Sequence, residues 1–195
     1  MNGNQNHPTE GSQTKVEPIR RLRDITAIKK LLQASPRNYA IFVMGINTYM
    51  LPGELINLKV SQVKHIDPDG HIQVADEKSG KEKSYVLNKA CIDAIQNLLA
   101  SDDYRDDDNL FRSQRGDLIL PSLSRLVKKW CDALNLSGNY GAHTLRKTWG
   151  YHQHYTYGVD IQTLKKCFNH PSANQTKEYL YIKDDDIDEI VYHEL

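Results

Sequence analysis

The sequence has few cysteines and no long apolar segment. Its three cysteines, Cys91, Cys131 and Cys167, stand far apart and are odd in number, which argues against a disulfide framework and against the paired spacing of a zinc site. No apolar run approaches the length that crosses a bilayer, and the N-terminus lacks the basic-then-apolar layout of a signal peptide. We therefore expect reduced thiols in a cytoplasmic protein that has no membrane partner.

The sequence also lacks net charge, since 25 basic residues balance 25 acidic ones. A neutral chain at first argues against a nucleic-acid partner, because DNA binding needs an excess of Lys and Arg. However, two short acidic runs, at 102–108 and 184–189, hold ten of the acidic residues and one of the basic ones. The rest of the chain is therefore basic, and its composition permits a polyanionic partner without requiring one.

Hydrophobic periodicity predicts the fold. Residues 1–17 have almost nothing to bury and predict a disordered tail or linker, which leaves 18–195 as one domain. Helical spacing, with Asp24, Ser35 and Asn88 as N-caps, predicts helices at 25–34, 36–46, 52–58, 89–99, from Ser122 or Ser124 to 134, and at 143–157, 161–168, 174–181 and 186–193. Period-2 segments predict strands at 63–66, 72–75 and 84–87. The expected fold is α+β, mostly helical with a small three-stranded antiparallel sheet.

Five side chains spread along the chain could act together on one phosphate group. His143 and Arg146 are three residues apart and share a helix face, where the guanidinium fork matches phosphate oxygens and the imidazole can relay a proton. His170 lies in a turn, and Tyr179 is a weak nucleophile unless positive groups favour its ionisation. Lys78, at a hairpin tip, could protonate a departing alkoxide. Taken singly, each of them also fits a solvated or structural role.

In combination, these residues resemble the catalytic domain of the tyrosine recombinases, the phage integrase family, over about residues 25–181. The segments that carry the resemblance are Asn47-Thr48-Tyr49-Met50-Leu51-Pro52-Gly53-Glu54-Leu55, Glu77-Lys78-Ser79-Gly80-Lys81, His143-Thr144-Leu145-Arg146, Phe168-Asn169-His170-Pro171-Ser172, and Tyr179 nine residues after His170. Each segment is common alone, but all five occur in the order and at the spacing of the family.

The resemblance implies a site-specific DNA recombinase or integrase that breaks and rejoins strands through a 3′-phosphotyrosyl intermediate. The residues that it assigns to the site are the nucleophile Tyr179 (in preference to Tyr181), the general acid Lys78, the phosphate-binding Arg146, the hydrogen-bonding His143 and His170, and the supporting acid Glu54. It further implies double-stranded DNA as the partner, a multimer assembled on that DNA, and no metal or other cofactor.

One loop departs from the family pattern. Leu51 stands where the family has its first phosphate-binding arginine, and Tyr49 replaces a glycine of the same loop. Loss of one such donor lowers the rate by roughly a hundred- to a thousand-fold. Either another cation fills the gap or activity is impaired; the candidate cations are Arg20, Arg21, Arg23 and Arg37. The alternative hypotheses are a non-catalytic DNA-binding relative that regulates or competes with an active recombinase, and a topoisomerase-like enzyme that relaxes supercoils.

Two expectations concern the ends of the chain. Family members usually carry an N-terminal core-binding domain that closes around DNA, and the short segment before the first helix predicts that this domain is absent. At the other end, residues 187–195 predict a terminal helix. That helix either docks on a neighbouring protomer or packs on its own domain.

Overall fold

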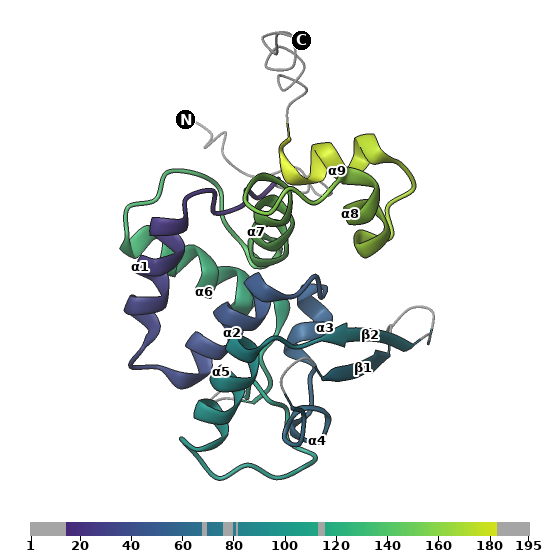
Figure 1. Cartoon of the computed structure of the whole chain (residues 1–195). Helices are drawn as coiled ribbons and strands as arrows, with labels where there is room; N and C mark the ends of the chain where they lie inside the picture. Colours follow the sequence, from purple (N-terminus) through teal and green to yellow (C-terminus); the bar gives the residue numbers. More distant parts are fainter. Residues whose placement is uncertain (1–14, 68–69, 76–79, 81, 113–115, 183–195) are drawn as a thin grey trace, which may run out of the picture.

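The computed structural model describes residues 15–67, 70–75, 80, 82–112 and 116–182 (Figure 1). The elements in chain order are α1 (Leu22–Leu32), α2 (Pro36–Asn47), α3 (Pro52–Ile56), α4 (Val60–Val63), β1 (His71–Ala75), β2 (Glu82–Val86), α5 (Lys89–Leu99), α6 (Leu120–Ala133), α7 (Ala142–Tyr155), α8 (Ile161–Phe168) and α9 (Ala173–Leu180). The described chain is mostly helical with one small antiparallel sheet, which confirms the α+β class.

Helices α2 and α7 lie at the centre of the packing. α2 packs against α1, α5 and α7, and it buries an unbroken run at 40–45, while α7 also contacts α6 and α9. Figure 1 shows α8 and α9 on one side of α7, with the two-stranded sheet extending from the other part of the molecule. A second, smaller apolar cluster consists of Leu164, Phe168, Leu180 and Ile182, so the last two helices have a core of their own.

Two of the predicted helix starts are confirmed. Ser35 is the N-cap of α2, and Pro36 follows it at the first helical position, where a missing N–H costs nothing. At α5 the side chain of Asn88 accepts a hydrogen bond of 3.1 Å from the backbone N–H of Cys91. An asparagine cap of this kind satisfies a donor that the helix itself leaves unpaired.

Two other predicted starts are wrong. α1 begins before Asp24, which lies in the first turn, where a carboxylate still interacts favourably with the helix dipole. α6 begins at Leu120 instead of at Ser122 or Ser124. The hydroxyl of Ser124 accepts a hydrogen bond of 3.1 Å from the backbone N–H of Ala142. This serine therefore joins α6 to the start of α7 instead of opening its own helix.

The sheet has two strands among the described residues, β1 and β2, and not the three that were predicted. The segment 63–66 is not a strand, because α4 and a turn occupy this region. Val60 and Val63 are both buried at the three-residue spacing of a helix face, and a short apolar segment fits that spacing as well as it fits a strand. The backbone N–H of Val60 donates to the carbonyl of Asp108 at 3.1 Å, so a loop pairs with this segment.

The segment before α1 is bonded to the body of the domain. Glu17, which the sequence places in the tail, donates its N–H to the carbonyl of Asn139 at 2.7 Å. The N–H of Ile19 donates to the hydroxyl of Thr148 on α7 at 2.8 Å. Among the described residues no helix is long and apolar enough to cross a membrane. The parts of the predictions that lie outside the described residues are the tail at 1–14, Lys78 and the terminal helix at 187–195.

α7 approaches α8 and α9 closely at Gly150, where a Cβ would come within 2.5 Å of Cζ of Phe168 and 2.8 Å of Cδ2 of Leu180. We predict that Gly150→Ala lowers the free energy of unfolding by about 1–3 kcal/mol, because overpacking outweighs the gain in helix propensity. Urea denaturation measures the loss. The control is Gly53→Ala on α3, where nothing lies within 4 Å of the added methyl. Equal losses in both variants would contradict the packing explanation.

Candidate active site

Arg146 joins α7 to the loop that precedes α3. Its side chain is buried, and its Nε donates a hydrogen bond of 2.7 Å to the backbone carbonyl of Tyr49. The guanidinium carbon lies 4.7 Å from the ring centroid of Phe168 and 5.9 Å from that of Tyr179. A carbonyl and two aromatic rings thus hold the guanidinium in one orientation, and they place a positive charge beside the tyrosine.

Tyr179 lies at the end of α9 between Arg146 and His170. The ring of His170 meets the tyrosine ring edge-on, with 5.1 Å between the centroids. The Tyr179 hydroxyl is buried and has no hydrogen-bond partner of good geometry among the described residues. Burial raises the pKa of Tyr179, and the nearby guanidinium of Arg146 opposes that rise. At rest the hydroxyl therefore keeps its proton at neutral pH.

His143 and His170 approach Arg146 from different elements. Desolvation first, and the charge of Arg146 second, lower the pKa of both imidazoles, and Lys147 adds to this effect at His143. The side chain of His143 is exposed to solvent, so its desolvation is only partial. His170 is half-buried, and its Nδ1 lies 3.0 Å from the hydroxyl of Thr176, which orients the ring. Both rings are neutral at pH 7 and can accept a proton.

Lys147 is a candidate that sequence reasoning missed. It lies on α7 with its side chain buried, and its Nζ is 4.6 Å from the ring centroid of Tyr179 and 4.8 Å from that of Tyr181. Burial, followed by the charge of Lys15, lowers the pKa of Lys147 to about 8, against the opposing effect of Glu17. No local signal in the sequence reveals this position, because a lysine next to an arginine on a helix is usually interpreted as one of two solvent-exposed side chains.

Tyr181, the competing nucleophile, has different surroundings from Tyr179. It is the C-cap of α9 and has a left-handed backbone, with φ of 58°. Its ring contacts Lys147 and lies 5.9 Å from the guanidinium carbon of Arg20. Among the contacts of the described residues, none joins Tyr181 to Arg146 or to His170. The arginine and the imidazole therefore gather around Tyr179 and not around Tyr181.

The site has a second wall, which faces Arg146 and consists of Leu51, Lys83 and Tyr85 around Glu54 of α3. The buried carboxylate of Glu54 accepts three hydrogen bonds of 2.7 Å, from the backbone N–H of Leu51, the hydroxyl of Tyr85 and the ammonium of Lys83. Burial raises the pKa of Tyr85, and its hydrogen bond to Glu54 raises it further. The carboxylate thus fixes the loop of Leu51 against strand β2.

A cavity of about 490 Å³ lies between the two walls. Leu51 lines it together with three cationic side chains, Arg146 from α7, Lys83 from β2 and Lys166 from α8. The structure therefore brings Glu54 and Arg146, which are distant in sequence, to the same site.

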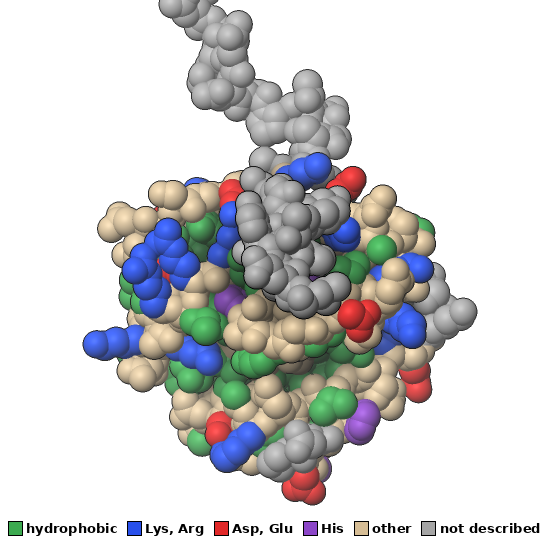
Figure 2. All heavy atoms as spheres, turned by 45° about the horizontal axis from the view of Figure 1, so that its top comes forward, with side chains coloured by type: hydrophobic (Ala, Val, Ile, Leu, Met, Phe, Trp, Pro, Cys, Tyr) green, Lys and Arg blue, Asp and Glu red, His purple; other side chains and the backbone are tan. Residues whose placement is uncertain are grey.

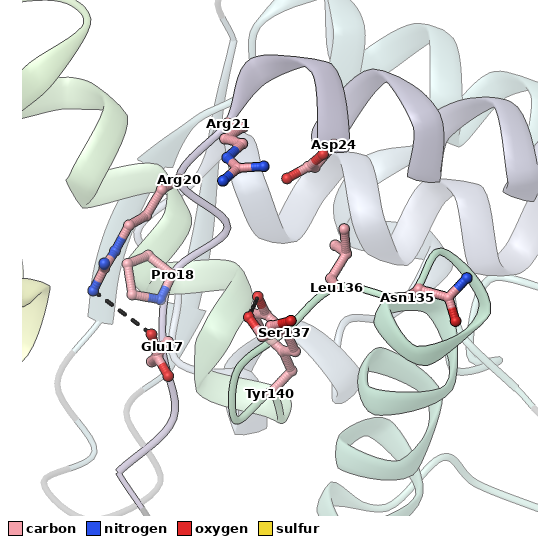
Figure 3. Close-up of a pocket in the computed structure, with 9 residues that line it drawn as sticks. All are labelled: Glu17, Pro18, Arg20, Arg21, Asp24, Asn135, Leu136, Ser137 and Tyr140. Carbon is pink, nitrogen blue, oxygen red and sulfur yellow. Dashed lines mark hydrogen bonds and ion pairs between the residues drawn. The ribbon is translucent and has the colours of Figure 1, made fainter.

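The four arginines that the sequence offers as candidates for the missing cation do not line this cavity. Arg37 donates to the backbone carbonyl of Arg112 at 3.3 Å. Arg20 and Arg21 line a separate cavity of about 260 Å³ beside α1, which Figure 3 shows in close-up. Arg23 lies next to Asp24 with most of its side chain exposed. In the described structure, therefore, none of these four candidates is among the residues that line the cavity with Leu51.

Comparison with known proteins identifies the family. The phage integrase family model matches residues 19–185, which is most of the chain. The chain belongs to the phage integrase family. The segments that carry the resemblance, and Leu51 among them, all lie within the matched residues.

Two relatives in this family are similar over most of the chain. A probable integrase/recombinase, YoeC of Bacillus subtilis (strain 168), is 30% identical over 173 residues, which are 87% of this chain and 92% of YoeC. Tyrosine recombinase XerC of Caldanaerobacter subterraneus subsp. tengcongensis is 33% identical over 174 residues, which are 84% of this chain and 48% of XerC. The chain thus spans nearly all of one relative and about half of the other.

Solved structures share the integrase fold. The crystal structure of XerA recombinase superposes with a TM-score of 0.72 at 24% identity, over 89% of this chain and 64% of XerA. The catalytic domain of bacteriophage HP1 integrase gives a TM-score of 0.59 at 20% identity, over 90% of this chain and 94% of that domain. XerH bound to its difH substrate before cleavage gives a TM-score of 0.70 at 18% identity, over 91% of this chain and 53% of XerH.

The three bonds to Glu54 predict a measurable contribution to stability. Glu54→Gln removes the negative charge that pairs with Lys83. It also replaces one acceptor oxygen by an NH₂ group, although the surrounding groups of Leu51, Lys83 and Tyr85 are all donors. We expect the free energy of unfolding to fall by about 1–3 kcal/mol, measured by urea denaturation. The control is Asp93→Asn, which breaks an exposed ion pair with Lys89 and should cost less than about 1 kcal/mol. A Glu54→Gln loss no larger than that of the control would show that the buried network is not stabilising.

Proposed function

We propose that this chain breaks and rejoins strands of double-stranded DNA, with Tyr179 as the nucleophile. The observation that carries the proposal is the position of Tyr179 between Arg146 and His170, in a member of the phage integrase family. The three residues come from α9, α7 and the turn between α8 and α9. A guanidinium matches phosphate oxygens, an imidazole can move a proton, and a tyrosine can form a covalent link to phosphorus.

The proposed reaction is a transesterification. The Tyr179 oxygen attacks the scissile phosphorus and the bond from phosphorus to the 5′ oxygen breaks, so a 3′-phosphotyrosyl link and a 5′-hydroxyl form. The neutral imidazole of His143 or His170 accepts the tyrosine proton, and Lys78 protonates the departing oxygen. Arg146 stabilises the charge on the non-bridging oxygens. Attack by a 5′-hydroxyl on the same link rejoins the strand, and because the link keeps the bond energy, no nucleotide cofactor is consumed.

The surroundings of the Tyr179 hydroxyl set a condition on this reaction. The hydroxyl is buried, and burial raises its pKa, so the free chain does not present a phenolate. Attack therefore requires that DNA binding shift α9 or carry the phosphate to the hydroxyl. The negative charge of that phosphate also has to be held by cations beside Tyr179, which is the role proposed for Arg146.

DNA as the partner is supported by the relatives and by the surface. XerH has been crystallised on difH substrate before cleavage and on palindromic difH substrate after cleavage, and a structure of the Tn1549 transposon integrase is in complex with transposon right end DNA. Figure 2 shows Lys and Arg side chains at several places on the face that turns forward from the top of Figure 1, with a few Asp and Glu side chains among them, so positive charge is available there for contacts with phosphates. We propose that the chain, as an integrase-like catalytic domain, assembles as a multimer on such DNA.

One observation favours a second candidate function. Leu51 places an apolar side chain where the family pattern has an arginine, and a site with one cation fewer stabilises the transition state less. On this alternative the chain binds DNA without cutting it, and it regulates or competes with an active recombinase. Binding without any covalent adduct is the result that separates the second candidate from the first.

We predict that Tyr179→Phe abolishes the covalent adduct. The chain is incubated with a pool of randomised, nicked suicide duplexes, and adducts that survive SDS are isolated and sequenced. The wild type should yield a recurrent site, Tyr179→Phe none, and the matched control Tyr181→Phe an amount within about tenfold of the wild type. An adduct that persists in Tyr179→Phe and disappears in Tyr181→Phe would reassign the nucleophile. A wild type that binds DNA without forming an adduct would instead support the regulatory alternative.

The histidines predict the pH dependence of cleavage. Because desolvation and Arg146 lower the pKa of His143 and His170 from 6.5, both imidazoles are still mainly neutral at pH 6.5. A neutral ring accepts the proton of Tyr179, so the single-turnover rate should hold down to below pH 6.5 and fall only at lower pH. The measurement follows adduct formation from about pH 5 to about pH 8, with DNA binding followed in parallel. A rate already halved above pH 6.5 would contradict the role given to these rings.

A further inference from the structure

The cavity between the two walls gathers positive charge. Arg146, Lys83 and Lys166 line it, and no Asp or Glu is among the described residues of its lining. Glu54 is the nearby acid, and its carboxylate is bound to Lys83, Tyr85 and the backbone of Leu51. The three cations therefore outweigh the single carboxylate. A pocket with this balance of charge is suited to an anion.

Lys83 is held in this cavity more firmly than an ordinary surface lysine. Its ammonium donates to Oε1 of Glu54 at 2.7 Å, and the carboxylate is itself fixed by two further donors. An ammonium has three donors, so it can hold a carboxylate and a phosphate oxygen at the same time. A side chain that is already ordered loses little conformational entropy when it binds a ligand.

Tyr49 connects Lys83 to the opposite wall. The backbone carbonyl of Tyr49 accepts the hydrogen bond from Nε of Arg146, and its hydroxyl donates to the backbone carbonyl of Ser84 at 3.3 Å. Ser84 follows Lys83 directly on β2. One residue therefore bridges the helix that carries Arg146 and the strand that carries Lys83, so the two cations occupy fixed positions on either side of the cavity.

We propose that Lys83 is a second phosphate-binding residue of this site, whose ammonium holds a non-bridging oxygen of the scissile phosphate opposite Arg146. Lys83 on β2 thereby supplies the positive charge that is missing from the loop of Leu51, where the family pattern has an arginine. Glu54 positions the ammonium. This inference rests on the proposed function and adds to it a residue that the family pattern does not assign.

Lys166 is the competing cation in the cavity. It lies in the last turn of α8, is exposed, and its side chain has no hydrogen bond or ion pair among the described residues. A mobile surface ammonium pays the full entropy of ordering when it binds, and salt screens it. The geometry therefore favours Lys83, and the two lysines can be tested side by side.

The test compares two DNA substrates that differ only at the scissile position. The duplex recovered from the suicide pool is made with an ordinary phosphodiester and with a methylphosphonate, which lacks the negative non-bridging oxygen. On the phosphodiester, Lys83→Met should cleave about 100- to 1,000-fold more slowly than the wild type. On the methylphosphonate, the same variant should fall within about tenfold of the wild type, because no charge remains for the ammonium to hold. A purely structural defect would slow both reactions equally.

The control variant is Lys128→Met on the exposed side of α6, where the lysine Nζ lies 3.5 Å from Asp132. It should cleave the phosphodiester within about tenfold of the wild type. Lys166→Met tests the competing cation, and its loss on the phosphodiester should be smaller than that of Lys83→Met. The double variant Glu54→Gln, Lys83→Met removes the whole ion pair, so that no unpaired carboxylate remains if Lys83→Met alone folds poorly. It should show the same difference between the two substrates.

The outcomes are separable. If the wild type cleaves and Lys83→Met keeps its rate on the phosphodiester, the inference is wrong while the proposed function stands. An equal loss on both substrates, or a charge-dependent loss in Lys166→Met instead, also overturns it. A wild type that forms no adduct with any duplex overturns the proposed function, and this inference with it.

Discussion

The hydrogen bond from Nε of Arg146 to the carbonyl of Tyr49 holds the candidate site together. A buried guanidinium is costly unless its donors are satisfied and its charge is compensated. Here a backbone carbonyl, the face of Phe168 and the ring of Tyr179 provide that compensation. Because α7 is anchored in the main core and Tyr49 follows α2, this single bond connects the rigid centre of the domain to the loop that closes the cavity.

A second network completes the site by electrostatics. Glu54 collects a backbone N–H, a tyrosine hydroxyl and an ammonium, so the loop, β1–β2 and α3 share one buried charge. Desolvation, with Arg146 second, lowers the pKa of His143 and His170, while burial raises that of Tyr179. The site at rest therefore holds neutral rings and a protonated tyrosine around a fixed cation, which is a suitable starting point for receiving a phosphate.

Local chemistry explains which parts of the fold were predictable. Asn88 marks a helix start correctly because its side chain caps the next turn, and the start after Ser35 is correct because Pro36 fits the first helical position. The prediction of a strand at 63–66 was wrong, because a few apolar residues fit the period of a helix and of a strand equally well. Ser124 was taken for a cap on composition, whereas its hydroxyl serves the start of another helix, 18 residues further along the chain.

The sequence alone determined the family, the shared helix face of His143 and Arg146, and the order in which His170 and Tyr179 follow them. Those features depend on spacing along the chain, and spacing can be read directly. Tertiary structure decided which cations surround the candidate site: it placed Lys83 beside Glu54 and Lys147 against Tyr179, and it placed the four candidate arginines elsewhere. The physical reason is that the Lys83–Glu54 contact joins residues 29 positions apart and the Lys147–Tyr179 contact joins residues 179 − 147 = 32 positions apart, and no local pattern encodes such separations.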